Sequence, residues 1–468
     1  MISSRSNFHI LKVVLEAQSA HAIHTGHGDT THDSLIVRDA NGLPTLSGSS
    51  LAGVLRHQYQ QYFGEQQTQA LFGYAKGSEG QSSWLNMAWG LVHNSKNLPQ
   101  EGLLSTEQLA DPLLTKLLDV KPIVRQRVRL NEYGTTQDSG KFDVTLVPAG
   151  VRYTTWISYW CDGSEQSVSQ WQDFINMLVQ NPIRIGQGTR NGYGLFKIEA
   201  LYQADWDLKT VEGQRAYQQR SRQRALHQGF TELTLQEDNI AGVRASLNLT
   251  AESTWRIGGG EQYLDTNTAE RIPDLLPMHE TKIEWKNDKG TFVEKDLYLL
   301  PASAIKGALR HRIAFHYNCL NGIFIDENDD VGTDENHAVK TLFGFTKDQD
   351  AHAGLLSIQD IYLSQQATQT VTHNKIDRYT GGVIRGALFS EHVLWNSEIS
   401  IKIDILQPQK TIEPSIKQAL VMSLEDLAQG WLPIGASGSR GLGVFTDETG
   451  LGVQWSDQQQ WLEIGETA

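Results

Sequence analysis

Apolar residues recur at helical spacing in two stretches that each begin with serines or a Pro-Ala-Ser start. The stretches are PTLSGSSLAGVLRHQY at 44–59 and LLPASAIKGALRHRI at 299–313. In each, apolar side chains fall three or four residues apart, which predicts one buried helix face. Serine hydroxyls at such a start can accept hydrogen bonds from the free N–H groups of the first turn. We therefore expect a capped helix in each stretch.

The two stretches match each other at a fixed spacing of 254 residues. Ser49 matches Ser303, Gly53 matches Gly307, and Leu-Arg-His at 55–57 recurs at 309–311. Further paired segments follow in the same order in both halves. They are LFGYAK at 71–76 and LFGFTK at 342–347, the basic segments 121–142 and 373–389, and the glycine-rich segments 183–198 and 432–445. The chain is therefore predicted to be a duplicated unit.

The start of each predicted helix is also a candidate anion site. Free N–H groups and the positive end of the helix dipole attract anions, and Lys306 in the second copy would strengthen that attraction. The alternative is that these residues only cap and bury a helix, with Gly53 and Gly307 permitting close packing.

Positive charge concentrates in the two basic segments. Arginine alternates with other residues over 124–130, so a strand there would carry Arg125, Arg127 and Arg129 on one face. The second copy carries Lys375 and Arg378. Such a face suits a phosphate backbone. A solvated outer face, balanced by acids elsewhere, is the alternative.

The glycine-rich segments close each unit. One has glycines at 186, 188, 192 and 194 around Arg190, and the other has glycines at 435, 438, 441 and 443 around Arg440. Glycines this dense let the backbone approach a ligand and direct successive N–H groups at an anion. The segments are not a dinucleotide fingerprint, because a short β-like run follows instead of an amphipathic helix. A glycine-rich hairpin without a ligand is the competing interpretation.

The segment after a first predicted strand, 8–18, is rich in histidine. His21, His24, His27 and His32 lie within twelve residues, and imidazole is a common metal ligand. Their spacing fits no familiar zinc pattern. We therefore favour a polar loop over a dedicated metal site.

Length and composition indicate two α+β domains. A chain of 468 residues exceeds one ordinary core, and we divide it into 1–204, a surface helix or linker at 205–236, and 237–468. The net charge of −14 argues against a surface that coats nucleic acid everywhere, but it permits a local basic groove. Two cysteines exclude a disulfide scaffold. Without a membrane-spanning stretch or a secretion signal, we expect a soluble cytoplasmic protein that contacts no membrane.

The order of these elements, repeated twice, resembles the RAMP superfamily of CRISPR-associated proteins. The closest likeness is to backbone subunits of type III effector complexes, here as a tandem fusion of two. The resemblance implies two ferredoxin-like (RRM-like) domains, each with a thumb β-hairpin and helical insertions. It also implies that the chain holds a guide CRISPR RNA, contacts target RNA through the thumbs and assembles with other effector subunits. Guide–target pairing, and not the protein, would read the sequence.

The resemblance implies a set of RNA-binding residues in both units. They are Ser49, Ser50, Arg56, Arg125, Arg127, Arg129, Gly186, Gly188, Arg190 and Gly192 in the first, and Ser303, Lys306, Arg310, Lys375, Arg378, Gly435, Gly438, Arg440 and Gly441 in the second.

Catalytic members of the family carry an aspartate in the loop before the first helix, followed six residues later by another in an Ile/Val-Arg-Asp ending. DSLIVRD at 33–39 matches this pattern and implies Asp33 as the catalytic residue. Such a carboxylate can position a divalent metal, Mg²⁺ or Mn²⁺, or help to deprotonate the ribose 2′-OH. The second unit departs from the pattern, because Asp265 and Asp274 are not placed by any motif.

Two alternatives remain open at this point. The chain is either a structural backbone subunit without catalytic activity, or a guide-processing endoribonuclease with a metal-independent histidine site, for which His24 and His27 are candidates. The duplication and the DSLIVRD segment count against the processing enzyme, and the leading hypothesis is a backbone subunit that cleaves target RNA with its first domain.

Overall fold

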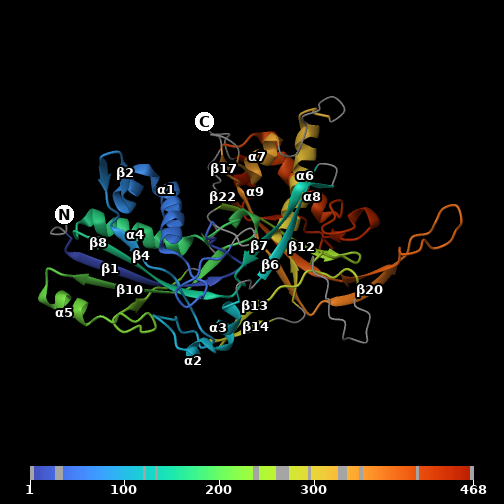
Figure 1. Cartoon of the computed structure of the whole chain (residues 1–468). Helices are drawn as coiled ribbons and strands as arrows, with labels where there is room; N and C mark the ends of the chain where they lie inside the picture. Colours follow the sequence, from blue (N-terminus) through green and yellow to red (C-terminus); the bar gives the residue numbers. More distant parts are fainter. Residues whose placement is uncertain are drawn as a thin grey trace.

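The computed structural model shows two α+β domains side by side (Figure 1). It describes residues 5–26, 35–119, 123–131, 135–235, 242–259, 273–293, 297–324, 335–346, 351–406 and 411–463. Within these ranges, no helix has both the length and the apolar character that crossing a bilayer requires.

The first domain is an antiparallel sheet with two helices on one face. Its main elements are β1 (Asn7–Ala17), α1 (Gly48–Phe72), β4 (Leu85–Met87), β8 (Arg152–Cys161), α4 (Glu165–Gln180) and β10 (Leu195–Asp207). The strands lie in the order β10-β1-β8-β4. Alternate residues of β1 and β8 point to the helices, so that Leu11 and Ile157 share a core with Leu55 of α1 and Phe174 of α4.

The second domain repeats this connectivity. Its main elements are β12 (Gly242–Ala251), α6 (Ala302–Leu320), β18 (Leu356–Ile358), β22 (Glu398–Leu406), α8 (Pro414–Ala428) and β23 (Phe445–Thr446). The order in the sheet is β18-β22-β12-β23. The final strand also pairs with the first at matching residues, because Ala17 lies opposite Phe196 and Ala251 opposite Phe445.

The predicted α+β class and the two tandem domains are therefore confirmed. Each sheet has β-α-β-β-α-β connectivity, with its strands in the spatial order four, one, three, two. This is the connectivity expected of a ferredoxin-like core. The fourth strand of the second domain is short, and β24 (Gln454–Trp455) pairs with the rest of β12.

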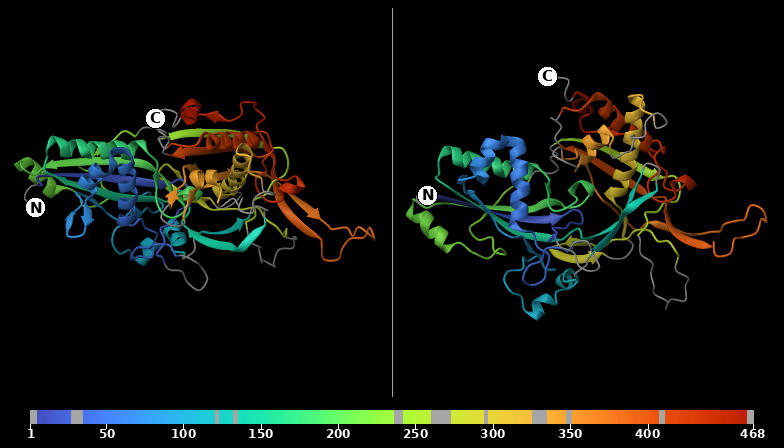
Figure 2. Two further views of the ribbon diagram at one scale, coloured as in Figure 1. Left: turned by 90° about the horizontal axis from the view of Figure 1, so that it is seen from above. Right: turned by 45° about the horizontal axis from the view of Figure 1, so that its top comes forward.

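Each domain carries a β-hairpin in its basic segment. The first is β6 (Ile123–Leu130) with β7 (Thr136–Leu146), and the second is β20 (Ala367–His373) with β21 (Phe389–Trp395). The second hairpin projects from the body of the molecule, as Figure 2 shows. The resemblance implies a thumb at the position of each of these two hairpins.

A third hairpin ties the second half of the chain to the first domain. It consists of β13 (Lys282–Lys286) and β14 (Lys289–Val293). Ile283 packs into the first domain's core, and its N–H donates to Ala149 O at 2.8 Å. The indole Nε1 of Trp285 donates to Gly150 O at 2.7 Å.

Residues 205–236, expected as a surface helix or linker, extend the first domain. β10 runs to Asp207, α5 (Val211–Gln219) follows, and β11 (Thr231–Glu232) pairs with β10. Tyr217 of α5 contacts the rings of Phe8 and Trp206 on the sheet face that α1 and α4 leave uncovered.

Shorter elements complete the domains. They are β2 (Tyr74–Lys76), β3 (Glu79–Gln81), β5 (Leu91–Val92), α2 (Thr106–Leu109), α3 (Pro112–Leu117), β9 (Ile183–Arg184), η2 (Thr189–Asn191), β15 (Leu297–Leu300), α7 (His337–Phe343), β16 (Gly344–Phe345), β17 (His352–Ala353), β19 (Ile361–Ser364), η3 (Gly438–Arg440) and α9 (Gln458–Glu463).

Candidate nucleic-acid interface

The first glycine-rich loop lies against the start of α6, where the two domains meet. Arg190 Nε donates to Gly354 O at 2.8 Å, and Lys306 Nζ donates to Asn191 Oδ1 at 2.9 Å. A Cβ added at Gly192 would lie 2.4 Å from the Cβ of Ala302. A side chain at Gly192 would therefore force the two domains apart, which explains the glycine.

Arg125 anchors the first hairpin in this junction. Its guanidinium contacts Glu280 through Nε at 2.5 Å and Nη2 at 2.6 Å, and Asp360 through Nη1 at 2.7 Å. Burial alone lowers the pKa of Arg125, but the carboxylates of Asp360 and Glu280 outweigh burial and hold this pKa well above its usual value. The side chain is 3% exposed and its charge is compensated. Arg125 is therefore a structural anchor, and the expectation that it contacts phosphate is corrected.

Arg127 shares the face of Arg125, as the alternation predicted. Both guanidinium groups lie over the ring of Tyr193, at 5.1 Å for Arg125 and 5.0 Å for Arg127. Arg127 forms no ion pair among the described residues, in contrast to Arg125. The side chain of Arg129 lies outside the described part of the chain.

Four cations from three elements gather at the junction. We call Arg127, Arg190, Lys306 and Arg310 the junction cluster. Burial, and then the positive charges of Arg127, Arg310 and Arg190, lower the pKa of Lys306 to about 8. Burial and then Arg184 lower the pKa of Arg190 to about 10. Among the described residues, the charges that shift the pKa of Lys306 are all positive, although the chain as a whole carries −14. Such a cluster favours an anionic ligand.

The two glycine-rich loops have the same backbone conformation. Each has a short 3₁₀ turn between two left-handed residues, Gly188 and Gly192 in the first loop and Ser437 and Gly441 in the second. Ser437 therefore corresponds to Gly188, and Gly438 lies one position after the counterpart of Gly188. Arg440 accordingly corresponds to Asn191 and not to Arg190.

The second loop is more exposed than the first. Gly435 follows the same pattern as Gly186, with φ of 103° and 97°. Arg440 and Gly441 are exposed, and a Cβ at Gly441 would meet nothing within 4 Å. Arg440 Nη2 donates to Ser437 Oγ at 2.5 Å, within its own loop.

The predicted helix starts are present, but the matched serines do not cap them. Ser47 is the N-cap of α1, and its Oγ accepts from Ser50 N at 3.3 Å. Ser49 is exposed inside the first turn. The N-cap of α6 is Pro301 without a side-chain cap, and Asp360 Oδ1 instead accepts from Ala302 N at 2.8 Å. Ser303 is therefore not a cap either.

The matched glycines of both helices face open space. A Cβ at Gly53 or at Gly307 would meet nothing within 4 Å. The close-packing explanation for these glycines is therefore wrong. Glycine in a helix costs stability relative to alanine, so an approach of a ligand to the backbone is the better reason for both.

The second hairpin presents an exposed tip. Lys375 and Arg378 are exposed in its connection, and Tyr379 is 99% exposed. The carboxylate of Asp377 holds the turn, because its Oδ1 accepts from Tyr379 N at 2.9 Å and Thr380 N at 2.8 Å. The tip therefore combines a fixed turn, two cations and an uncovered aromatic ring.

The predicted catalytic residue Asp33 lies outside the described residues, as do His27, His32 and Asp265. The end of its motif is described and has a structural role. Arg38 Nη1 donates to Leu117 O at 2.8 Å, and Asp39 Oδ1 accepts from Asn41 N at 2.8 Å and Leu43 N at 2.9 Å.

The described histidines and carboxylates do not form a metal centre. Among the residues that the structure describes, no three His, Cys, Asp or Glu side chains are grouped to hold a metal ion. His24 hydrogen-bonds to Gln187 Oε1 and, at 3.1 Å, to Thr145 O. Asp274 Oδ2 accepts from Ser390 N at 2.7 Å.

The sequence did not predict the two carboxylates that pair with Arg125 at the junction. Glu280 and Asp360 lie outside every repeated segment, and nothing in the spacing of either residue signals that it pairs with Arg125. It also missed Arg5, Trp84 and Trp160, which line a hollow beside α1. None of these three residues lies in a repeated segment or a strand that the sequence predicted.

Comparison with known families identifies the class of this chain. The family model described as the RAMP superfamily matches residues 17–197 and 248–446. These two regions make up most of the chain and coincide with the two domains. The chain therefore belongs to the RAMP superfamily.

Similar solved structures include two from one kind of assembly. A chain of "Cryo-EM structure of the Type III-B Cmr-beta bound to cognate target RNA" is 14% identical, with a TM-score of 0.29, and the match covers 42% of this chain and 61% of that one. A chain of "Type III-B Cmr-beta Cryo-EM structure of the Apo state" is 11% identical, with a TM-score of 0.30, covering 41% and 96%. No curated protein matches the chain.

Proposed function

We propose that this chain is a backbone subunit of a type III CRISPR effector complex and holds a guide CRISPR RNA across the junction of its two domains. The junction cluster is the observation that carries this proposal. Its four cations come from the first hairpin, the first glycine-rich loop and the start of α6, and they lower the pKa of Lys306 by mutual repulsion after burial. Phosphate groups would relieve that repulsion. Membership of the RAMP superfamily supports the same interpretation.

The two helix starts and the exposed hairpin extend the proposed path. Gly53 and Gly307 leave the backbone of α1 and α6 open to a ligand. The second hairpin carries Lys375 and Arg378 beside the uncovered ring of Tyr379. Cations next to an exposed aromatic ring suit phosphates and an unstacked base. We infer that this tip contacts the guide–target duplex, and that other effector subunits flank the chain along the guide.

Salt-dependent binding of guide RNA tests the proposed path. We expect Arg127→Ala and Lys306→Met each to weaken binding of a guide CRISPR RNA and to reduce the slope of log K against log salt by about 0.7. Lys209→Ala is the matched control, because Lys209 is exposed two residues before α5, and α5 lies at the opposite end of the molecule from α6 (Figure 1). Equal slopes in all three variants would refute a guide path across the junction.

We further propose that the first domain cleaves target RNA with Asp33 and a divalent metal, Mg²⁺ or Mn²⁺. The DSLIVRD segment supports this proposal. Because Asp39 is held in a turn by two backbone N–H groups, Asp33 is the carboxylate of this segment that we assign to the chemistry. It would position the ribose 2′-OH for attack on the adjacent phosphate.

Target cleavage by the assembled complex tests this second step. We expect Asp33→Ala to abolish cleavage at the sites adjoining the first domain while guide binding is unchanged. Unchanged cleavage would favour the alternative, a structural subunit without catalytic activity. Processing of a guide precursor in EDTA would instead favour the histidine-based endoribonuclease.

A further inference from the structure

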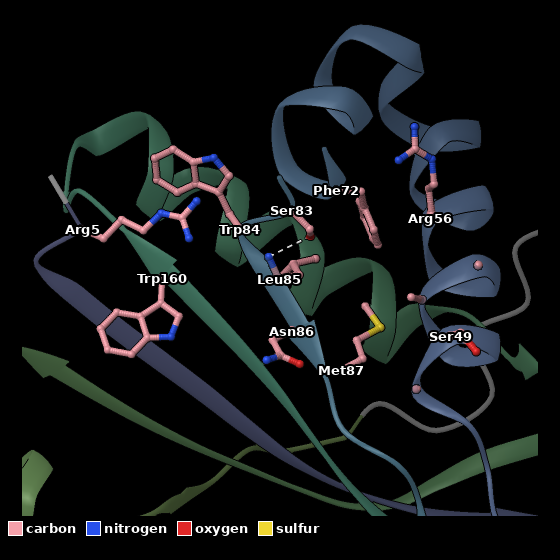
Figure 3. A pocket seen from close by; sticks show the side chains of 13 residues that line it. Arg5, Ser49, Arg56, Phe72, Ser83, Trp84, Leu85, Asn86, Met87 and Trp160 are labelled. Atoms are coloured by element: carbon pink, nitrogen blue, oxygen red, sulfur yellow. Dashed lines mark hydrogen bonds between the residues drawn. The ribbon is translucent and has the colours of Figure 1, made fainter. Parts of the chain in front are cut away.

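A hollow of about 570 Å³ opens beside the first half of α1. Figure 3 shows Ser49 and Arg56 of α1 on one side of it and Arg5, Trp84 and Trp160 on the other. Residues 85–87 of β4 lie between the two sides, with the exposed amide of Asn86 among them. The hollow therefore lies on the edge strand of the first sheet, outside the junction.

The second domain fills the equivalent position with protein. There the first glycine-rich loop lies against Ala302 and bonds to Gly354 O. By the repeat, Ala302 corresponds to Gly48, and both residues begin a helix. In the first domain, no described segment of the chain takes the place of that loop, and a hollow is left.

The lining differs between the two domains in a definite way. Trp160 N donates to Trp84 O at 3.1 Å, and Leu406 N donates to Leu355 O at 2.8 Å in the same position of the second sheet. The first domain therefore has two indoles where the second domain has two leucines. Leu355 is buried in the core of the second domain, whereas the indoles of Trp84 and Trp160 are partly exposed and suit a flat aromatic ligand.

The hollow is also positively charged. The guanidinium of Arg5 lies 4.9 Å from the ring centre of Trp84, and Arg56 Nη1 donates to Gly73 O at 2.7 Å. Within the described ranges, the contacts of these arginines are with an indole ring and a backbone carbonyl, and no acidic residue lines the hollow. In a chain with a net charge of −14, this local excess of positive charge favours an anionic ligand.

We propose that this hollow binds one unstacked nucleotide of a single-stranded RNA. The base packs against Trp84 and Trp160, the amide of Asn86 hydrogen-bonds to the base edge, and Arg5 and Arg56 neutralise the flanking phosphates. This inference rests on the proposed function in that the chain binds RNA, but it concerns a different surface from the junction cluster. Stacking of this kind is tolerant of sequence, so the site takes any nucleotide.

Photo-crosslinking of a short RNA to the full chain tests this inference. The probe is a single-stranded tetranucleotide that carries 4-thiouridine, and mass spectrometry maps the adducts. We expect an adduct on the peptide that contains Trp84 or Trp160. Trp84→Leu, which installs the residue of the second domain, should reduce its yield about tenfold, and Arg56→Ala should act similarly. Trp431→Leu removes an indole that is 68% exposed elsewhere and should have no effect.

Two results would overturn the inference. One is an adduct yield in this peptide that Trp84→Leu leaves unchanged. The other is displacement of the probe by a peptide of residues 432–445 at concentrations at which unlabelled tetranucleotide does not compete, since the hollow would then accept a protein loop. Lys306→Met separates the two proposals, because it should weaken guide RNA binding and leave this adduct unchanged.

Discussion

Lys306 carries its charge at a cost in the folded chain without RNA. Burial first, and then three neighbouring arginines, lowers its pKa from 10.5 to about 8. Between these values the unfolded chain binds the proton more tightly than the folded chain does. The contribution of Lys306 to folding stability therefore becomes more favourable as pH rises from about 8 toward 10.5, and is least favourable below 8.

Binding of phosphates should raise the pKa of Lys306 again. At about pH 8.5 we therefore expect guide RNA binding to take up a proton, which titration calorimetry in buffers of different ionisation enthalpy measures. Lys306→Met should abolish most of this uptake and should raise the urea midpoint of the RNA-free chain at neutral pH. Lys209→Met, at an exposed site, is the control. Equal uptake in both variants would contradict the role given to Lys306.

For single residues, the sequence predicted which face of a strand carries positive charge, but it did not predict which carboxylates pair with that charge. The alternation over 124–130 correctly placed Arg125 and Arg127 on one face. It could not distinguish a buried arginine from an available one, because Glu280 and Asp360 lie 155 and 235 positions further along the chain. The capping role of Ser303 failed for a similar reason, since Asp360 takes that role from another element.

At the scale of elements, the start of α6 shows a conflict between stability and approach of a ligand. Gly307 lies inside α6, and a Cβ there would meet nothing within 4 Å. We expect Gly307→Ala to stabilise the chain by up to about 1 kcal/mol in urea unfolding. The same change should weaken guide RNA binding, because the new methyl group occupies the space beside Lys306.

An alanine substitution at a helix position outside the proposed RNA path is the control for Gly307→Ala. Gln418→Ala in α8 changes an exposed helix position, and its effect on RNA binding should be negligible. If Gly307→Ala stabilises the chain and leaves RNA affinity unchanged, the proposed approach of RNA to the backbone at Gly307 is wrong.

The repeated motifs predicted which elements exist and their order, but not their full extent. The expected helix at 44–59 continues to Phe72, although Gly64 interrupts it with φ of 79°. The polar residues after Tyr59 hide this continuation from a search for apolar periodicity. The one-position shift between the glycine-rich loops was equally hidden, because Ser437 adopts the left-handed conformation that glycine usually adopts.

At the scale of the whole molecule, the duplication correctly gave two domains with one connectivity. Nothing in the sequence pattern indicates that the two halves are interlocked. The hairpin β13–β14 belongs to the second half, yet Ile283 is 4% exposed in the core of the first domain. Apolar periodicity identifies buried residues, but it does not say in which core they lie.

The interlock predicts that a change in the second half destabilises the first domain. Ile283→Ala should cost about 2–5 kcal/mol. Hydrogen exchange should accelerate at Ala149 and Gly150 and along β1 and β8. Ile399→Ala, in the second core, should accelerate exchange in β12 and β22 and leave β1 unaffected. Unchanged exchange in the first domain of the Ile283 variant would contradict the interlock.

The decisive experiment is a structure of the chain bound to a guide CRISPR RNA. We expect successive guide phosphates to contact Arg127 and Lys306 at the junction, with the backbone of the first glycine-rich loop beside them. A guide that runs elsewhere on the surface, with the junction cluster facing only solvent, would contradict it.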